Sequence, residues 1–172
     1  MKENDPVWYA CYGSNLKAKR FKDYIVGNDD PELGSPKEGC IDKTLWKDSK
    51  VKEYPGVIYF GNRSNKYWDN KGVAFYDPNQ EGKTLMRLYK ITYGQLLDVW
   101  KQEGNGKDWY NSLYPLEIAE DGIQVYTITS EERKKTNQPS EKYRTVIKEA
   151  LVDECGMREE DAQEYLRQAL NR

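Results

Sequence analysis

Residues 7–16 read VWYACYGSNL, and this stretch predicts how the chain begins to fold. Its first part, residues 7–12, is a run of β-branched and aromatic residues that is typical of a strand. The run stops at a Gly-Ser-Asn turn, and a helical pattern follows over about residues 16–26, with Gly27 as its C-cap. The start of a helix carries free backbone N–H groups. The turn can therefore bind an anion or a developing oxyanion, or it can serve only as a helix cap.

The rest of the chain alternates short strands with a few helices. We expect strands in the short apolar runs that turn residues separate, at residues 57–60, 73–76, 85–91, 114–119 and 124–129. Further helices are expected at residues 93–103, 140–155 and 159–170, and the first two have cap signals at their ends. Residues 28–55 are expected to form a long connection with one short element near residues 41–46.

This order of elements predicts one α+β domain over residues 1–172, with a late helical extension at about residues 157–172. Many short strands around few helices favour a small, partly open mixed β-barrel with helices packed around it. The 14 Tyr, 5 Trp and 3 Phe predict an aromatic-rich core, since each ring buries a large apolar area.

The charge balance gives no sign of a nucleic-acid partner. Lys and Arg number 27 and Asp and Glu number 29, so the net charge is −2 and the excess of basic residues that marks nucleic-acid binding is missing. The N-terminus lacks the apolar run of a signal peptide, and no stretch has the length of a spanning helix. We therefore expect a cytoplasmic protein that binds neither nucleic acid nor membrane.

The absence of histidine narrows the chemistry. Ser-His-Asp triads, Cys-His pairs and HExxH zinc sites all need an imidazole, and the chain has none. Cys11, Cys40 and Cys155 are far apart and form no CxxC pair, so neither a structural zinc nor a disulfide framework is expected. In its strand, Cys11 is expected to be a small buried hydrophobic residue rather than a nucleophile.

Three other side chains are candidates for catalysis or binding. Glu103 precedes the C-cap Gly104, where the helix dipole disfavours a carboxylate; an aromatic pocket around it would raise its pKa toward that of a general acid or base. The hydroxyls of Tyr110 and of Tyr143, one turn into the helix after Pro139, could contact a ligand. Each residue also has a structural interpretation, since a glutamate before a cap is commonly exposed and tyrosines are commonly core residues.

Taken in order, these segments resemble the γ-glutamylcyclotransferase-like family. The turn sequence YGSNL at residues 12–16 is similar to the family's substrate-binding loop. The sequence LLDVWKQEG at residues 96–104 resembles the helix end that carries the family's catalytic glutamate, and Tyr110 falls where the family has a pocket tyrosine. The sequence PSEKYRTVI at residues 139–147 is similar to the motif that opens the family's late helix, and WDNKGVA at residues 68–74 resembles a strand entry of the family.

The resemblance implies an enzyme that releases 5-oxoproline from a γ-glutamyl amine, peptide or tailored small molecule. In this reaction the free α-amine of the glutamyl group attacks its own γ-carbonyl, so proximity is built into the substrate. The resemblance implies that Glu103 is the catalytic acid and base, without a metal or another cofactor. It places substrate binding on a set of residues that should share one cavity with Glu103, namely Tyr12, Gly13, Ser14, Asn15, Leu16, Tyr110 and Tyr143.

Two alternatives remain open at this point, and the released amine and the oligomeric state are not predicted. The first alternative is a non-catalytic small-molecule binding or regulatory protein on the same fold, which the intact Glu103 argues against. The second is a metal-dependent amide hydrolase or deacetylase, which the lack of histidine and of a clustered Asp/Glu ligand motif disfavours. The segments 28–55 and 159–170 depart from the family pattern, so they leave the substrate more open than the chemistry.

Overall fold

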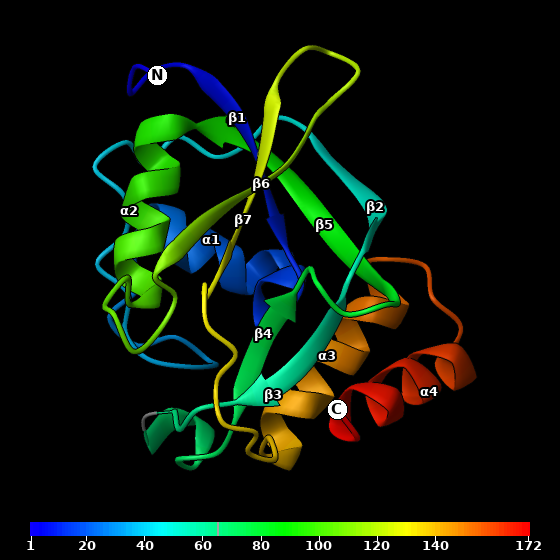
Figure 1. The fold of residues 1–172 in the computed structure, drawn as a ribbon. Coiled ribbons are helices and arrows are strands. Elements are labelled where there is room, and N and C mark those ends of the chain that lie inside the picture. Colours follow the sequence, from blue (N-terminus) through cyan, green and yellow to red (C-terminus); the bar gives the residue numbers. More distant parts are fainter. Residues whose placement is uncertain (65) are drawn as a thin grey trace.

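A mixed five-stranded sheet with the order β2-β5-β1-β7-β6 lies at the centre of the computed structural model, which describes residues 1–64 and 66–172 (Figure 1). Strand β1 is the middle strand; it pairs antiparallel with β5 and parallel with β7, and all its residues after Pro6 are buried. The sheet contains β1 (Pro6–Cys11), β2 (Ser49–Pro55), β5 (Lys83–Thr92), β6 (Ser112–Ile118) and β7 (Gln124–Thr129). The central strand therefore carries the turn that follows it into the interior of the molecule.

A separate two-stranded ribbon, β3 (Val57–Gly61) with β4 (Val73–Asp77), packs beside the larger sheet. A side chain joins the two sheets at one point: Thr129 Oγ1 at the end of β7 donates to the Tyr76 carbonyl oxygen (2.6 Å) and accepts from the Tyr76 N–H (3.2 Å). Here β4 and β7 are joined by a side chain and not by a ladder of backbone hydrogen bonds. The barrel is therefore partly open. The fold class expected from the sequence is confirmed.

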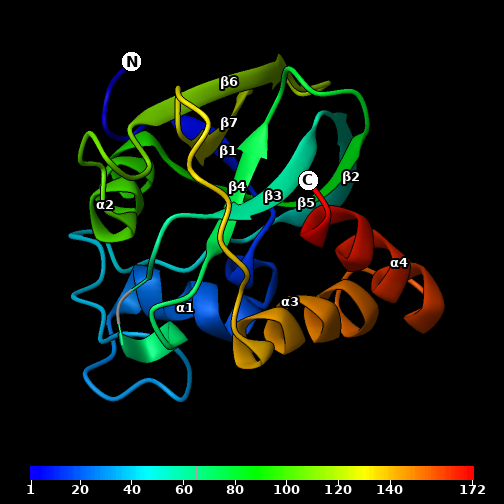
Figure 2. The same ribbon diagram turned by 60° about the horizontal axis from the view of Figure 1, so that its bottom comes forward.

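Four α-helices are present in the described part of the chain, and they surround the sheets (Figure 2). Helices α1 and α3 lie on one side, α4 runs alongside α3, and α2 packs against α1, β1 and β5 (Figures 1 and 2). Short 3₁₀ turns are formed by Ser14–Leu16 and Lys66–Trp68. The helices span Ala18–Val26 (α1), Tyr93–Glu103 (α2), Glu141–Asp153 (α3) and Glu159–Leu170 (α4).

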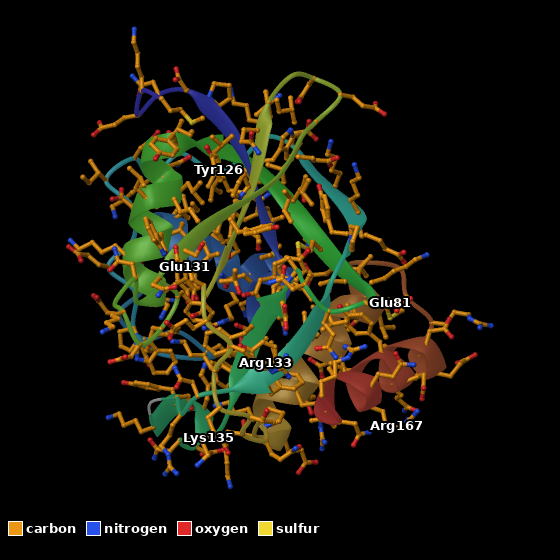
Figure 3. All side chains as sticks on the ribbon, viewed as in Figure 1. Glu81, Tyr126, Glu131, Arg133, Lys135 and Arg167 are labelled. Carbon is orange, nitrogen blue, oxygen red and sulfur yellow. The ribbon has the colours of Figure 1, made fainter. Side chains whose placement is uncertain are left out.

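The segment between β7 and α3 crosses the β3–β4 ribbon and holds it in place. Arg133 lies near the ribbon (Figure 3). Its guanidinium is 4.0 Å from the centre of the Tyr59 ring, and the same side chain pairs with Asp77 at 3.1 Å. Further along, the Asn137 N–H donates to the Phe60 carbonyl oxygen at 3.1 Å. The ribbon is thereby held by the segment between β7 and α3 as well as by Thr129.

The core is rich in aromatic side chains, as the composition predicts. Phe21 of α1 stacks on Tyr89 of β5 with ring centres 4.2 Å apart, and Tyr9 of β1 lies 5.3 Å from Phe21. All three side chains are buried. These contacts fix α1 against the middle of the sheet, so the turn that connects β1 to α1 is held at both ends. No helix in the described residues is long and apolar enough to cross a membrane.

The structure differs from the sequence-based prediction in the segment 28–55. Residues 41–46 form no regular element, and Ile41 is 93% exposed. Ser49–Pro55 instead forms β2, an edge strand in which Tyr54 alone is buried. Neither face of β2 is covered continuously, so its sequence lacks the alternation of apolar and polar residues that identifies a half-buried strand. The expected helix 93–103 and its N-cap Thr92 are confirmed without change.

Thr92→Ala tests the N-terminus of the helix that ends at Glu103. The Thr92 hydroxyl accepts from the Gln95 N–H, and the Gln95 side chain accepts from the Thr92 N–H, which forms a capping box. Loss of this cap should lower the free energy of unfolding by about 1 kcal/mol. Chemical denaturation measures the change. Thr145→Ala is the control, because Thr145 is an exposed residue inside α3 and should not be destabilising; equal losses in the two variants would contradict the role of the cap.

Candidate active site

The turn after β1 is buried and tightly bonded. Residues Ser14–Leu16 form a single 3₁₀ turn, in which the Leu16 N–H donates to the Gly13 carbonyl oxygen at 3.0 Å. Arg20 on the first turn of α1 reaches back and donates from Nε to Ser14 Oγ at 2.7 Å. A Cβ on Gly13 would lie 3.2 Å from the Tyr143 hydroxyl oxygen, so the glycine allows the turn backbone to approach the site closely.

Glu103 is the last residue of α2, and its neighbour Gln102 fixes the helix end. The Gln102 side chain donates from Nε2 to the Tyr24 carbonyl oxygen at 2.9 Å and accepts from the Gly39 N–H at 3.0 Å. Gly104 then adopts the left-handed conformation with φ +88°, which stops the helix. The hydrogen bonds of Gln102 and the cap at Gly104 therefore hold the end of α2, and with it the backbone from which the Glu103 side chain extends.

The turn and the helix end meet through one hydrogen bond. Asn15 Nδ2 donates to Glu103 Oε1 at 2.9 Å, although the two residues are 88 positions apart in the chain. The oxygen of the same amide, Asn15 Oδ1, is buried and accepts no hydrogen bond from the described residues. An unused acceptor beside the carboxylate suits a ligand that brings N–H groups to this point. Residues 13–15 and Glu103 thus lie together, as is required if they share one cavity.

Burial sets the protonation behaviour of Glu103. The low-polarity surroundings disfavour the ionised form and raise the pKa of the carboxyl group, while Arg20 and Lys37 and hydrogen bonding from Tyr24 and Asn15 oppose the rise. The net direction is upward. A carboxyl group with a raised pKa gains and loses a proton more readily near neutral pH than an exposed one does.

Among the tyrosines that line the site, the three expected from the sequence differ in the partners of their hydroxyls. Tyr12 donates to the Ile128 carbonyl oxygen at 2.6 Å, and Tyr110 donates to the Ala74 carbonyl oxygen at 2.8 Å. Tyr143 accepts from the Ala74 N–H at 3.0 Å, so its own proton remains available to a ligand. Burial raises the pKa of Tyr143 to about 12, which keeps the hydroxyl protonated.

The side chains enclose two adjoining cavities. The inner cavity of about 40 Å³ is lined by residues of the turn, by Glu103 and by the three tyrosines. The outer cavity of about 220 Å³ contains Arg20, Lys37, Trp68 and Trp109. The two cavities share the lining residues Ser14, Glu103, Tyr110 and Tyr143. One elongated ligand can therefore occupy both, with Glu103 near its middle.

The sequence analysis missed the two cations of the outer cavity. Arg20 is 7% exposed and lies on α1. In the sequence it cannot be told apart from a charged residue on the exposed face of an amphipathic helix. Lys37 is 8% exposed and comes from the misread segment 28–55. Desolvation, with Arg20 nearby, lowers the pKa of Lys37 to about 8. No local sequence signal marks either residue, because both are brought to the site by the tertiary fold.

Leu16 and Cys11 differ from the other residues of the first turn and strand. Leu16 is fully buried and lines neither cavity, because its side chain packs in the core; its expected part in substrate binding stays a prediction. Cys11 lines the inner cavity, but burial raises the pKa of its thiol and the thiol donates to the Arg87 carbonyl oxygen at 3.4 Å. A protonated, buried thiol is a poor nucleophile.

Comparison with solved structures shows the same fold in several proteins. A γ-glutamyl cyclotransferase superposes with a TM-score of 0.67 at 15% identity, over 94% of this chain and 87% of that one. The fold is that of a γ-glutamyl cyclotransferase. An uncharacterized human protein gives a TM-score of 0.65 at 16% identity, over 96% and 88% of the two chains. YkqA from Bacillus subtilis gives 0.64 at 18% identity, over 96% of this chain and 54% of YkqA.

Sequence comparison gives one further relation. No protein-family model matches the chain. Over 99 residues the chain is 39% identical to histone deacetylase 5 of Arabidopsis thaliana, a match that covers 56% of this chain and 15% of that protein. The chain thus matches a small part of the length of this curated relative. Among the described residues, no three Cys, Asp or Glu side chains are grouped so that they could hold a metal ion.

Glu103→Gln should stabilise the protein at neutral pH. Because the native pKa of Glu103 is raised, ionisation disfavours the folded state at pH 7, and glutamine removes that penalty. The gain in the free energy of unfolding should shrink as the pH falls through the native pKa and vanish below the ordinary carboxyl value of about 4.3. Denaturation at a series of pH values measures it. The exposed Glu120→Gln serves as the control; a Glu103→Gln variant less stable than wild type at pH 7 would contradict a raised pKa.

Proposed function

We propose that the chain is a γ-glutamylcyclotransferase-type enzyme that releases 5-oxoproline from a γ-glutamyl compound. The observation that carries the proposal is the contact between Asn15 and Glu103, which places a partly buried carboxyl group of raised pKa beside the turn at residues 13–15 in one cavity. The fold shared with a γ-glutamyl cyclotransferase supports the same reaction class. At 15% identity that likeness concerns the fold, so the assignment of activity depends on the site.

The reaction is an intramolecular aminolysis that needs little besides positioning and proton transfer. The neutral α-amine of the glutamyl group attacks its own γ-carbonyl carbon and forms the ring C–N bond. Glu103 accepts a proton from the attacking nitrogen and donates one to the leaving nitrogen, whose bond to the γ-carbon then breaks. The carboxylate ends the cycle as it began, and the products are 5-oxoproline and an amine.

The groups around Glu103 have roles that match the steps of this reaction. Asn15 Oδ1 can accept from the attacking amine, which orients its lone pair toward the carbonyl carbon. The N–H groups of Ser14 and Asn15 open the 3₁₀ turn and so have no partner within it, which suits them to hold the glutamyl carboxylate or the developing oxyanion. The Tyr143 hydroxyl can donate to the same negative charge.

A panel of γ-glutamyl compounds tests the proposal directly. Purified protein is incubated with γ-glutamyl amines and γ-glutamyl peptides, and 5-oxoproline and glutamate are measured by mass spectrometry with and without a chelator. The proposal predicts 5-oxoproline, at a rate that the chelator does not change. Saturable binding without turnover would favour a non-catalytic binding protein. Glutamate as the product, with loss of turnover on chelation, would favour metal-dependent amide hydrolysis.

Glu103→Gln should lower turnover on the best compound by about 10²–10⁴-fold, the range that general acid–base groups contribute. Glutamine keeps the shape and the hydrogen bond from Asn15 but cannot move a proton. The wild-type rate should rise with pH through a carboxyl pKa above its ordinary value, since the base form is required. Steady-state kinetics at several pH values provide both results; turnover within about threefold of wild type would exclude Glu103 as the proton-transfer group.

A further inference from the structure

The outer cavity contains two buried cations to which the proposed reaction assigns no contact with the substrate. Lys37 Nζ donates to Ser35 Oγ at 2.6 Å and lies 4.7 Å from the centre of the Tyr24 ring. The Arg20 guanidinium lies 5.7 Å from the same ring. Two like charges therefore face one ring in a cavity where each is more than nine-tenths buried.

Neither cation forms an ion pair in the described part of the chain, although Glu103 lines the same cavity and interacts with both through its charge. The ion pairs within residues 1–64 and 66–172 include neither Arg20 nor Lys37. Arg20 donates to Ser14 Oγ and to the Leu33 carbonyl oxygen, and Lys37 has the neutral Ser35 hydroxyl. Charged side chains are rarely buried without a counter-charge, because removing them from water is costly.

The charges of the cavity do not balance. With Glu103 ionised, the two cations leave an excess of one positive charge in the joined cavities, and when Glu103 is protonated during the reaction the excess becomes two. A bound anion would offset this excess. Both cations line the outer cavity; Arg20 touches the turn through Ser14, whereas Lys37 has no hydrogen bond to the turn.

The sizes of the cavities indicate which part of the substrate meets the cations. The inner cavity of about 40 Å³ holds the turn and Glu103, where the γ-carbonyl has to lie. The leaving amine must then extend past Glu103 into the outer cavity of about 220 Å³. Trp68 and Trp109 line that cavity, and the Arg20 guanidinium lies 5.1 Å from the centre of the Trp68 ring.

We propose that Arg20 and Lys37 form an anion subsite that selects γ-glutamyl compounds whose leaving amine carries a negatively charged group, a carboxylate or a phosphate-type group. The inference rests on the proposed function, and it assigns the specificity for the released amine to two residues outside the catalytic turn. Of the two, Lys37 is the cleaner residue to test, because Arg20 also anchors the turn through Ser14 and Leu33.

The test compares three compounds that differ in one terminal group: γ-glutamylglycine, its terminal amide and the corresponding aminomethylphosphonate. Wild type should use the two charged compounds with a kcat/KM about 10- to 100-fold above that of the neutral amide, the range that a hydrogen bond to a charged group gives. The order of the carboxylate and the phosphonate then distinguishes the two kinds of anion. Release of 5-oxoproline is measured by mass spectrometry.

Variants of Lys37 test the assignment. Lys37→Met should lower the ratio of charged to neutral substrate about tenfold, and Lys37→Arg should restore it, which a purely structural role of Lys37 would not do. Lys22→Met is the matched control, since Lys22 is an exposed lysine on α1. A ratio unchanged in Lys37→Met, or a wild-type enzyme without preference for the charged compounds, would overturn the subsite and leave the proposed function standing.

Binding separates the failure of the two proposals. Trp68 and Trp109 line the outer cavity, so their fluorescence should report binding of the same compounds to Glu103→Gln protein without turnover. If wild type releases no 5-oxoproline but the acid still binds more tightly than the amide in a Lys37-dependent manner, the proposed function is wrong and the subsite stands. Equal binding of the acid and the amide would overturn the subsite even without turnover.

Discussion

Asn15 Nδ2 donates a 2.9 Å hydrogen bond to Glu103 Oε1, and the site exists because this contact joins two distant parts of the chain. The amide comes from the turn after the central strand β1, and the carboxylate comes from the end of α2. A carboxylate that is partly removed from water is destabilised unless hydrogen bonds or opposite charges compensate. Hydrogen bonds and nearby cations compensate only part of the cost of removing the Glu103 carboxylate from water, so its pKa stays raised.

The surroundings make this contact rigid. Gln102 ties the end of α2 to the carbonyl oxygen of Tyr24 and to the Gly39 N–H, so the helix end does not move independently of α1. On the opposite side of the cavity, Tyr110 and Tyr143 hold the two backbone groups of Ala74 on β4. The carboxyl group and the possible hydrogen-bond donors thus come from bonded elements, the arrangement that precise positioning of a reacting group requires.

Much of this fold follows from local sequence signals. The capping box at Thr92 and the left-handed Gly104 set the two ends of α2, and with them the position of Glu103, from signals within a few residues. The edge strand β2 was missed because its residues alternate poorly and Tyr54 alone is buried. Arg20 and Lys37 could not be found from sequence either, since their burial results from the packing of α1 and the 28–40 segment around the cavity. Local patterns predict elements and caps, whereas charges that tertiary packing buries have no local signature.

The central claim is that the substrate's own amine, rather than water, attacks the γ-carbonyl. Turnover of a γ-glutamyl compound in ¹⁸O-enriched water, followed by mass spectrometry of the products, measures this most directly. The account predicts 5-oxoproline without ¹⁸O, because the ring nitrogen displaces the amine and no water enters the product. Glutamate carrying ¹⁸O in its γ-carboxylate would show that water is the nucleophile and would contradict the account.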